Sequence, residues 1–442
     1  VGAVPTGFDR KRYYKKELEL KMSASYGPGR YDPNYEDKGI DYPVGYVRWT
    51  EQRNMEAFNG LCETGAIDPG KLVTHEYDFE KATDAYDMIL AKEEAFSGVS
   101  LKYDLNKKLS SSVAINKSGS KTEKLVFGVI GAGSFATNFM LPSMQGQGKM
   151  KGLVTGTPSK AKHYAGKFGF EMSAGTADEL FSNDEINTVF IATRHDSHAE
   201  YVIQALKADK NVFVEKPLCL HPHELEPIAK AYKESKGQLV VGFNRRLAPN
   251  TLTLLKSFDN GLPKSINMRI NAGNVPPEHW VHDPEVGGGR IIGEGCHFID
   301  LCNAIAGSKL VSVSATAMGG APELMDTAVM SLQYEDGSVA AISYFSNGNH
   351  KVPKERIEVF SGTKTAIIDD FKQLTIYGNS VEKHKLSNQD KGHKAFLQAF
   401  CDQLKNGESI SPGFEQVYES TLATFKVVES IRLNGERLMM NE

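Results

Sequence analysis

Cysteine is scarce in this chain of 442 residues and follows no recognisable pattern. Its five cysteines form no CxxC pair and no zinc-ribbon spacing, which argues against a disulfide framework and against a structural zinc site. No apolar run approaches the ~20 residues of a membrane-spanning helix, and no signal peptide opens the sequence. We therefore expect no membrane partner and a reduced, cytoplasmic setting.

A surplus of one charge is also absent. Lys and Arg number 51 and Asp and Glu 55, which gives a net charge of −4. A general nucleic-acid binder needs a basic surplus that displaces counterions, so we expect no nucleic-acid partner. Hydrophobic residues make up 40% of the chain, enough for a real core, and its length is typical of about three domains.

The first quarter of the sequence and the stretch that follows it differ in composition. Residues 1–108 combine short apolar runs with helical periodicity, which predicts amphipathic helices over 49–61 and 79–90. Residues 109–123 are rich in Ser and Lys and hold few large apolar groups, the composition of a flexible linker.

The rest of the chain shows two patterns. Over 124–245 strand-like and helical runs alternate, which is typical of an α/β domain with a doubly wound parallel sheet. Over 246–442 longer alternating runs predict an α+β domain with a mainly antiparallel sheet. The expected strands are 125–130, 153–155, 188–192, 211–214 and 239–243, then 312–318, 327–334, 339–346, 356–360 and 365–369; the expected helices begin at 134, 159, 198 and 222 and span 392–404 and 414–433.

A glycine-rich turn directly follows the strand expected at 125–130 and opens a helix. In such a turn Gly131 permits the tight bend, Gly133 lets the backbone approach a pyrophosphate, and Ala136 is small enough for helix–strand packing. The setting predicts a Rossmann domain that binds a dinucleotide, although a glycine turn that binds nothing is the alternative. The expected cofactor contacts in the turn are Gly131, Gly133, Ser134, Phe135 and Ala136.

An acidic residue that would hold the adenosine ribose of NAD is missing. It is expected about 20 residues after the glycines, yet 131–170 contains no Asp or Glu. Thr155 and Gly156 end the second strand instead, with Lys151 and Lys160 nearby. Lysines at this place suit the 2′-phosphate of NADP, although they are often only a solvated face. The cofactor is therefore NADP or NAD, with a slight preference for NADP.

Three later motifs complete a pattern. They are Ala192-Thr193-Arg194-His195-Asp196-Ser197-His198, then Glu215-Lys216-Pro217, and then Gly287-Gly288-Gly289 ahead of Cys296-His297-Phe298-Ile299-Asp300. From residue 124 to the C-terminus the chain resembles the glucose–fructose oxidoreductase, inositol dehydrogenase and rhizopine-catabolism (Gfo/Idh/MocA) family. The resemblance implies a nicotinamide-dependent oxidoreductase that interconverts a secondary alcohol and a ketone on a sugar, a cyclitol or a derivative.

The same resemblance implies two catalytic residues. Lys216 would hydrogen-bond the reacting hydroxyl beside the nicotinamide, and His297 would exchange a proton with that hydroxyl. An imidazole suits this proton transfer, and an ammonium stabilises developing alkoxide charge. Taken singly, either residue could be a surface charge or a structural histidine. The remaining expected cofactor contacts are Thr155, Gly156, Lys160, Ala192, Thr193, His195, His198, Glu215, Lys216 and Arg245.

The sequence departs from the family pattern at one position. The family carries an aspartate four residues before the histidine, where Gly293 stands here. We expect Glu294 to substitute as a catalytic residue, although an offset of one residue turns a side chain elsewhere. Asp300 could orient His297 if the segment is helical. Cys296 and His297 have no further compact ligand set, so we expect no metal.

Other polar and aromatic residues are candidates for the substrate site. Arg245 could contact cofactor or substrate, or form a salt bridge at the domain boundary. Trp280 and His282 stand in a proline-containing loop, where they could stack on a sugar and hydrogen-bond to it, or simply anchor the loop. The expected substrate contacts are Lys216, Trp280, His282, His297 and Asp300.

Residues 1–108 carry a second resemblance. The segments 1–4, 15–18, 24–27 and 73–75 look like the last third of a zinc-type medium-chain alcohol dehydrogenase. The glycine loop and zinc ligands of that family are not in this stretch, so we expect no catalysis from it. We interpret the chain as a fragment of a bi-domain oxidoreductase.

Two other functions remain open at this stage. The chain could be a non-catalytic nucleotide-binding or assembly protein that lost turnover with the aspartate. It could also be a redox-neutral epimerase or glycosidase that retains and recycles its cofactor. In each case the antiparallel sheet offers a face for a homo-oligomer, and the partner is a small sugar-like molecule.

Overall fold

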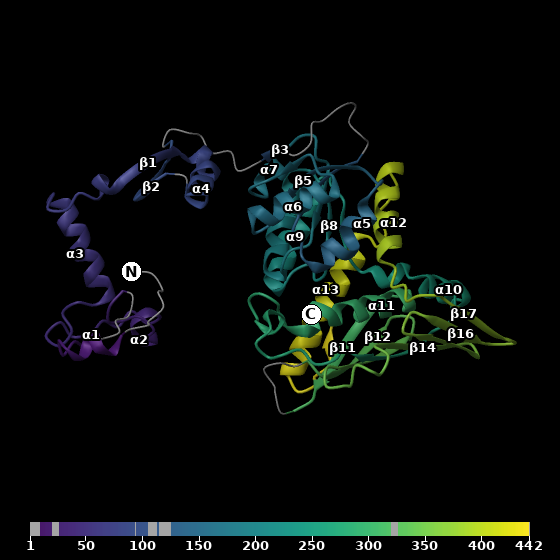
Figure 1. Cartoon of the computed structure of the whole chain (residues 1–442). Coiled ribbons are helices and arrows are strands. Elements are labelled where there is room, and N and C mark those ends of the chain that lie inside the picture. Colours follow the sequence, from purple (N-terminus) through teal and green to yellow (C-terminus); the bar gives the residue numbers. More distant parts are fainter. Residues whose placement is uncertain are drawn as a thin grey trace. The chain divides into compact units, whose positions relative to one another are not determined.

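The computed structural model describes residues 9–19, 26–92, 94–104, 113–114, 125–319 and 326–441. The chain divides into two compact units, Val1–Leu109 and Ser110–Glu442 (Figure 1). The segment 1–4 and most of the linker expected over 109–123 lie outside the described residues. Within the described ranges, no helix combines the length and the apolar character that crossing a bilayer requires.

The first unit contains a β–α–β arrangement with almost no core. Its elements are α1 (Arg10–Tyr14), α2 (Pro33–Glu36), α3 (Glu51–Glu63), η1 (Pro69–Leu72), β1 (Val73–Asp78), η2 (Phe79–Lys81), α4 (Ala82–Ala91) and β2 (Gly98–Lys102). β1 and β2 pair in parallel. Among the described hydrophobic residues of this unit only Ala85 is buried. Because so little apolar surface is buried, packing within this unit contributes little to its stability. The pair of parallel strands lacks the cover that such strands normally have on both faces.

The second unit begins with a seven-stranded sheet in the order β3-β6-β5-β4-β7-β8-β9. Its strands are β3 (Val113–Ala114), β4 (Val126–Ile130), β5 (Lys149–Val154), β6 (Met172–Ser173), β7 (Thr188–Ile191), β8 (Asn211–Val214) and β9 (Leu239–Val241). All neighbours are parallel except β3 and β6. The predicted Rossmann-type sheet is confirmed, because apolar strands such as β4 are buried along their whole length between helices.

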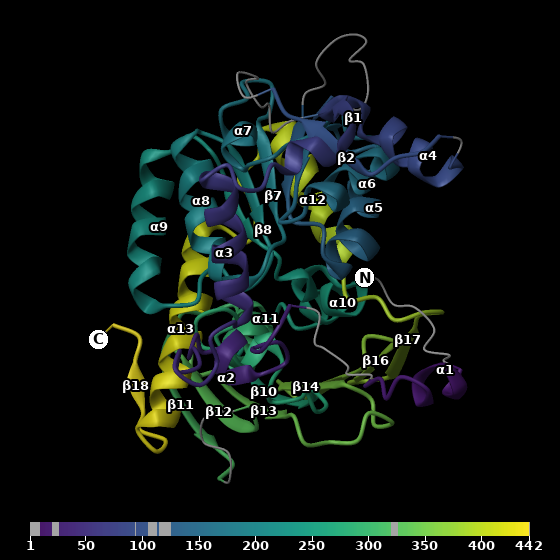
Figure 2. The same ribbon diagram turned by 60° about the vertical axis from the view of Figure 1, so that its left-hand side comes forward.

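Helices connect these strands and cover the sheet (Figure 2). They are η3 (Ala136–Met140), α5 (Leu141–Met144), α6 (Pro158–Phe168), α7 (Asp178–Phe181), η4 (His195–Ser197), α8 (His198–Lys207) and α9 (Pro222–Glu234). The helix expected from 134 is a widened π-type turn in η3 before it becomes regular in α5. The short β6 and α7 have no counterpart in the predicted elements, because runs of two to four residues carry no measurable periodicity.

A nine-stranded sheet follows in the order β17-β16-β15-β14-β10-β13-β12-β11-β18. Its strands are β10 (Ser265–Asn271), β11 (Leu310–Ala317), β12 (Ala328–Tyr334), β13 (Val339–Phe345), β14 (Glu355–Ser361), β15 (Lys364–Asp369), β16 (Gln373–Tyr377), β17 (Val381–Lys385) and β18 (Leu438–Met439). The mainly antiparallel sheet is confirmed; only β10 and β13 run parallel. Residues of β12 alternate between buried and exposed, as expected for a sheet with one covered face.

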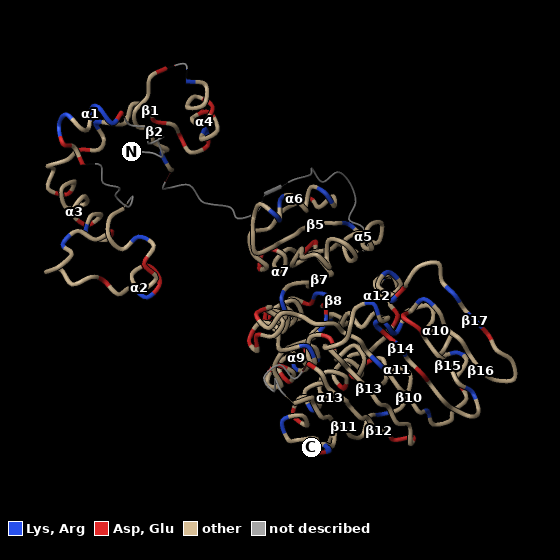
Figure 3. Tube along the Cα trace, turned by 60° about the horizontal axis from the view of Figure 1, so that its bottom comes forward, with Lys and Arg blue, Asp and Glu red and all other residues tan. Residues whose placement is uncertain are grey.

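The helical elements of this part lie on one face of the sheet, in the loops around it or, in one case, on the parallel sheet. They are η5 (Asn244–Leu247), α10 (Pro249–Ser257), η6 (Trp280–His282), η7 (Ile291–Gly295), α11 (Cys296–Ala306), α12 (His393–Asn406) and α13 (Phe414–Arg432). α11 and α13 pack together and against the sheet (Figure 1). Basic and acidic residues are interspersed along the trace (Figure 3), which agrees with the small net charge.

One C-terminal helix packs on the parallel sheet. The rings of Phe396 and Phe400 on α12 lie 6.0 and 5.8 Å from the ring of Phe213 on β8. His393 at the start of α12 lies against Phe135 beside the glycine-rich turn, with ring centroids 5.6 Å apart. The domain boundary expected between residues 245 and 246 stays a prediction; α12, from the later part of the chain, completes the first core.

Candidate active site

The glycine-rich turn has the geometry that a dinucleotide site needs. Gly131 has a φ of +97°, and a Cβ there would collide with the carbonyl oxygen of Ala192. A Cβ at Gly133 would meet no atom within 4 Å, so the backbone faces open space. Glycine at the first position is required for the bend, and the second leaves room for a pyrophosphate next to the backbone. These residues fit a nicotinamide dinucleotide.

A cavity of about 360 Å³ continues from this turn along the carboxyl ends of the strands. Thr155 and Gly156 line it, as expected for the adenosine end of the site. Lys160 does not line it, and Lys151 is paired with Glu171 and Glu185, each at 2.8 Å. The structure therefore gives no support to the expectation that these lysines receive a 2′-phosphate. The full lining is Ile130, Gly131, Val154, Thr155, Gly156, Gly175, Thr176, Ala177, Asp178, Thr193, Glu200, Tyr201 and Gln204.

Lys216 follows β8 at the carboxyl edge of the sheet, where ligands of open α/β sheets bind. Its Nζ donates a hydrogen bond of 2.8 Å to the carbonyl oxygen of Gly293. Gly293 holds the position expected for an aspartate, and a Cβ there would lie 2.9 Å from Cε1 of His195. A backbone carbonyl therefore receives the lysine, and the neighbouring imidazole leaves little room for a side chain at position 293.

His297 lies in the first turn of α11, one helical turn after Gly293. The side chain is buried, and its Nδ1 has no hydrogen-bond partner among the described residues. Burial, with the positive charges of Arg245 and Lys216 nearby, holds the pKa of His297 well below its usual 6.5. The imidazole is therefore neutral near neutral pH, the state in which it can accept a proton.

Glu294 is held by three donors and does not reach the role expected for it. Its carboxylate accepts hydrogen bonds from Arg290 at 3.0 Å and from the Tyr344 hydroxyl at 2.6 Å, and it is paired with Lys354. Although burial opposes it, the Lys354 charge lowers the pKa of Glu294 strongly overall. A carboxylate so strongly stabilised is a poor proton acceptor, which argues against the proton-transfer role expected for Glu294.

Asp300 and Arg245 are used in buried ion pairs. The segment is helical, as the orienting role for Asp300 required, but its carboxylate bonds Arg246 twice at 2.7 Å and Ser420 at 3.1 Å. Asp300 is therefore not placed to orient His297 or to meet a substrate. Arg245 forms two hydrogen bonds of 2.9 and 2.8 Å with Glu355, which matches the salt-bridge alternative considered for it.

The two histidines after β7 hold loops in place. His198 is fully buried, and its Nδ1 lies 2.7 Å from the carbonyl oxygen of Pro217, so it links the β7 and β8 ends. It therefore presents no surface to a cofactor, contrary to expectation. His195 Nδ1 lies 2.8 Å from the carbonyl oxygen of Gly287, and burial with the nearby charge of Lys216 lowers the pKa of His195 to about 3.

The loop that carries Trp280 and His282 is anchored to this histidine. The Trp280 ring meets the His195 ring edge-on at 5.0 Å, and the guanidinium of Arg194 lies 5.6 Å from the indole. Both ring nitrogens of His282 are buried without a partner among the described residues. The anchoring alternative therefore accounts for Trp280, whereas His282 has no polar contact that explains it.

The surroundings of Glu215, an expected cofactor contact, and the three partners of Glu294 escaped sequence reasoning. Burial raises the pKa of Glu215 to about 7, and its carboxylate lies against Gly242 at the end of β9. Glu215 shares a small pocket with Phe135 and His393, which brings α12 to the cofactor turn. Two partners of Glu294 come from distant parts of the sequence: Tyr344 is 50 residues away and Lys354 is 60. The third, Arg290, is four residues away, and no local motif connects the three to Glu294.

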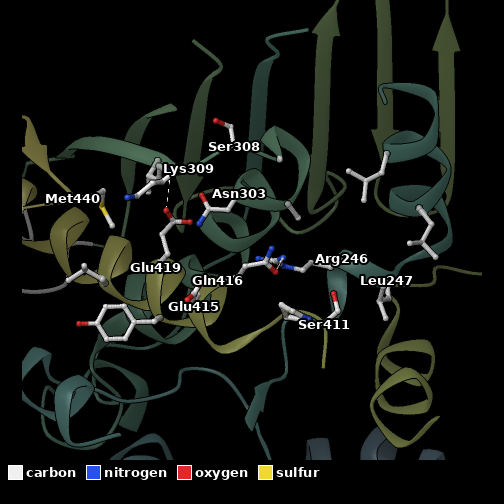
Figure 4. A pocket seen from close by; sticks show the side chains of 18 of the residues that line it. Arg246, Leu247, Asn303, Ser308, Lys309, Ser411, Glu415, Gln416, Glu419 and Met440 are labelled. Atoms are coloured by element: carbon white, nitrogen blue, oxygen red, sulfur yellow. Dashed lines mark hydrogen bonds between the residues drawn. The ribbon is translucent and has the colours of Figure 1, made fainter. Parts of the chain in front are cut away.

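A larger cavity than the one beside the glycine-rich turn lies elsewhere in the second unit. It has a volume of about 740 Å³ and is bounded by Arg246, the end of α11 and one side of α13 (Figure 4). The Arg246 guanidinium in its wall is already bonded to Asp300 and to Gln416. Neither Lys216 nor His297 lines this cavity, so its size alone does not identify the active site.

Comparisons with known proteins identify the family of these two domains. Residues 125–243 match the model of the oxidoreductase family with an NAD-binding Rossmann fold, and residues 253–368 match the GFO/IDH/MocA C-terminal domain. The inositol 2-dehydrogenase of Rhizobium meliloti is 28% identical over 249 residues, 54% of this chain and 74% of that protein. The levoglucosan dehydrogenase of Pseudarthrobacter phenanthrenivorans is 22% identical over 339 residues, 63% of this chain and 87% of that protein.

Solved structures share the fold. A levoglucosan dehydrogenase in complex with NADH and levoglucosan has a TM-score of 0.64 at 19% identity, over 72% of this chain and 100% of that one. The resemblance of residues 1–108 to a medium-chain alcohol dehydrogenase stays a prediction. Residues 125–243 and 253–368 are the NAD-binding and C-terminal domains of an oxidoreductase of the Gfo/Idh/MocA family.

Proposed function

We propose that this protein transfers hydride between a nicotinamide cofactor and a secondary alcohol or ketone of a sugar, a cyclitol or a derivative. The observation that carries the proposal is the convergence of Lys216 and the neutral, buried His297 on one helical turn, 293–297, at the carboxyl edge of the parallel sheet. Relatives named as inositol and levoglucosan dehydrogenases support the substrate class.

The chain's own residues would perform the proton chemistry. The Lys216 ammonium has three N–H donors, and one is used by the Gly293 carbonyl, which leaves two for a substrate oxygen. In alcohol oxidation, neutral His297 accepts the hydroxyl proton while Lys216 stabilises the developing alkoxide. When bound, the nicotinamide supplies or accepts the hydride. In the reverse direction His297 returns the proton to the carbonyl oxygen.

The cofactor site of this proposal follows the sheet edge. Gly131 and Gly133 with the backbone of Ser134, Phe135 and Ala136 would hold the pyrophosphate, where N–H groups at the beginning of a helix favour anions. Ala192 and Thr193 lie next to Gly131 and border the same path. The chemistry of this turn suits NAD and NADP alike, so the nucleotide is NAD(P).

The experiment that tests the proposal measures reduced nicotinamide formed by the purified chain with NAD or NADP and a panel of myo-inositol, levoglucosan and aldoses. We expect turnover with at least one polyol and its loss in His297→Asn. His384→Asn on the exposed strand β17 is the matched control and should keep full activity. Cofactor that stays bound and is never net reduced, while an isomer of the substrate forms, would instead favour the redox-neutral alternative.

We also propose a homo-oligomer formed through the uncovered face of the nine-stranded sheet. Val339, Ser265 and Phe360 are neighbours across β13, β10 and β14, and the two apolar members are 43% and 44% exposed. Sedimentation of the chain and of Phe360→Glu tests this, since a charge buried within such an interface should produce monomers. A cytoplasmic location stays a prediction, with which the five free cysteines are compatible.

A further inference from the structure

The adenosine end of the cofactor cavity is acidic although its strand lacks the usual acid. The cavity extends from Gly131 and Thr155 to Asp178 at the start of α7 and Glu200 on α8. Gly131 fixes where the pyrophosphate lies, and the end of β5 is where an adenosine ribose is held in this type of fold. The two carboxylates therefore come from the neighbouring segments of the sheet edge rather than from β5.

The residues that follow β5 supply no carboxylate in place of the missing acid. The Thr155 hydroxyl donates its hydrogen to the carbonyl oxygen of Thr157 at 2.8 Å and accepts from the Thr157 N–H at 3.3 Å. A hydroxyl has one hydrogen and two acceptor lone pairs, so this group can still accept one hydrogen bond but carries no charge that could attract or repel a phosphate. Gly156 has no side chain, and a Cβ there would meet nothing within 4 Å. The ribose end of the site is therefore open, and the residues that follow β5 add no charged side chain to it.

No positive side chain balances the acids in this cavity. Its described lining contains no Lys or Arg. Lys151 is buried between Glu171 and Glu185. The Glu200 carboxylate accepts a hydrogen bond of 2.9 Å from the Gln204 amide, which is uncharged. Tyr201 lines the same cavity as the two carboxylates, and burial together with the charges of Glu200, Asp178 and Asp196 raises its pKa.

We propose that Asp178 and Glu200 make this enzyme select NAD(H) against NADP(H) by electrostatic repulsion of the 2′-phosphate. The inference rests on the proposed function, because the dinucleotide must bind along this sheet edge. A 2′-phosphate carries close to two negative charges, and no cation in the lining offsets its repulsion by two carboxylates. The unmodified ribose of NAD carries no charge and meets no such penalty.

The test is a fluorescence titration of the whole chain with NADH and with NADPH at low ionic strength. We expect NADH to bind at least about tenfold more tightly than NADPH. The double variant Asp178→Asn, Glu200→Gln should reduce the ratio of the two affinities because it binds NADPH more tightly. Its affinity for NADH should stay within about twofold of the wild-type value. Asp178→Arg should narrow it further. Glu234→Gln, at the exposed end of α9, should leave both affinities unchanged.

Salt gives a second readout that does not depend on variants. Raising the ionic strength screens exposed charges, so the preference of the wild-type protein for NADH should shrink. Equal or tighter binding of NADPH by the wild type, or a ratio that the neutral double variant leaves unchanged, would overturn the inference. Binding of neither nucleotide would overturn the proposed function and this inference with it, whereas an unaffected ratio would overturn this inference alone.

Discussion

Lys216 donates a 2.8 Å hydrogen bond to the backbone carbonyl oxygen of Gly293, the position where the family pattern has an aspartate. The carbonyl keeps the lysine in place without adding a negative charge. In the described part of the chain Lys216 forms no ion pair with a carboxylate. After burial and the charge of Arg245, this lysine is the next cause of the lowered pKa of His297. The difference at position 293 thus changes the electrostatics of the site but leaves both side chains of the proposed catalytic pair in it.

Restoring the family aspartate should damage this protein. A Cβ at position 293 would lie 2.9 Å from Cε1 of buried His195, so Gly293→Asp must displace that ring. We expect a loss of about 1–3 kcal/mol in the free energy of unfolding together with reduced kcat/KM. Thermal unfolding and steady-state kinetics check this. Gly166→Asp, where a Cβ meets nothing within 4 Å, is the control; equal effects at both positions would contradict the steric explanation.

The pH dependence of alcohol oxidation should report the lowered pKa of His297. Since the imidazole is neutral until the pH falls well below 6.5, kcat/KM should stay flat through pH 6.5 and decline only at lower pH. His297→Asn should reduce kcat by about 10²–10⁴ and remove this decline. A decline centred at or above 6.5, or one that persists in His297→Asn, would contradict the assignment.

Glu294→Gln separates positioning from proton transfer. The glutamine keeps the shape but not the charge that pairs with Lys354 and Arg290. We expect a moderate fall in kcat/KM and an acid decline at the same pH as in the wild type, because Glu294 is not the group that titrates. Tyr344→Phe, which removes one neutral donor to the same carboxylate, should have a smaller effect. A shift or loss of the pH decline in Glu294→Gln would show a catalytic carboxyl group instead.

The buried pair of Arg245 and Glu355 should be important for stability. Removing one partner leaves an uncompensated buried charge, so Glu355→Gln should lower the free energy of unfolding by about 3–5 kcal/mol. The more exposed pair of Arg356 and Glu358 is the control, and Glu358→Gln should cost less than about 1 kcal/mol. Urea unfolding of the three proteins measures the difference.

The same carboxylate gives an acid-stability prediction. Despite its burial, Arg245 and Lys391 lower the pKa of Glu355 to about 2 in the folded protein, whereas its usual value is 4.5. The stabilisation is therefore complete above pH 4.5 and is lost as the pH falls toward 2. Glu355→Gln should flatten this part of the stability curve. If the free energy of unfolding of Glu355→Gln falls between pH 4.5 and 2 as steeply as that of the wild type, the lowered pKa of Glu355 is contradicted.

Local patterns in the sequence predicted most of the fold. β8 has the predicted bounds, 211–214, because a short apolar run between turn residues has few alternatives. The glycine turn was recognisable because φ at Gly131 requires glycine. The packing of α12 on the parallel sheet was not predictable, since the amphipathic pattern of 393–406 gives a buried face but not the surface that covers it.

The site was predictable only where a motif carried it. Lys216 and His297 each stand in a short recognisable segment, and the structure brings those segments together. Asp300 was misplaced because the spacing along α11 does not reveal that Arg246, 54 residues earlier, takes its carboxylate. Lys151 was misplaced for the same reason, as its two glutamates are 20 and 34 residues away.

The most direct test of the central claim compares turnover and cofactor binding in the wild type, Lys216→Met and His297→Asn. If these residues act on the substrate hydroxyl, both variants should bind NADH nearly as tightly as the wild type, yet lose hydride transfer to a substrate ketone by about 10²-fold or more. Variants that keep wild-type turnover while binding NADH normally would contradict the assignment of Lys216 and His297 as the catalytic pair.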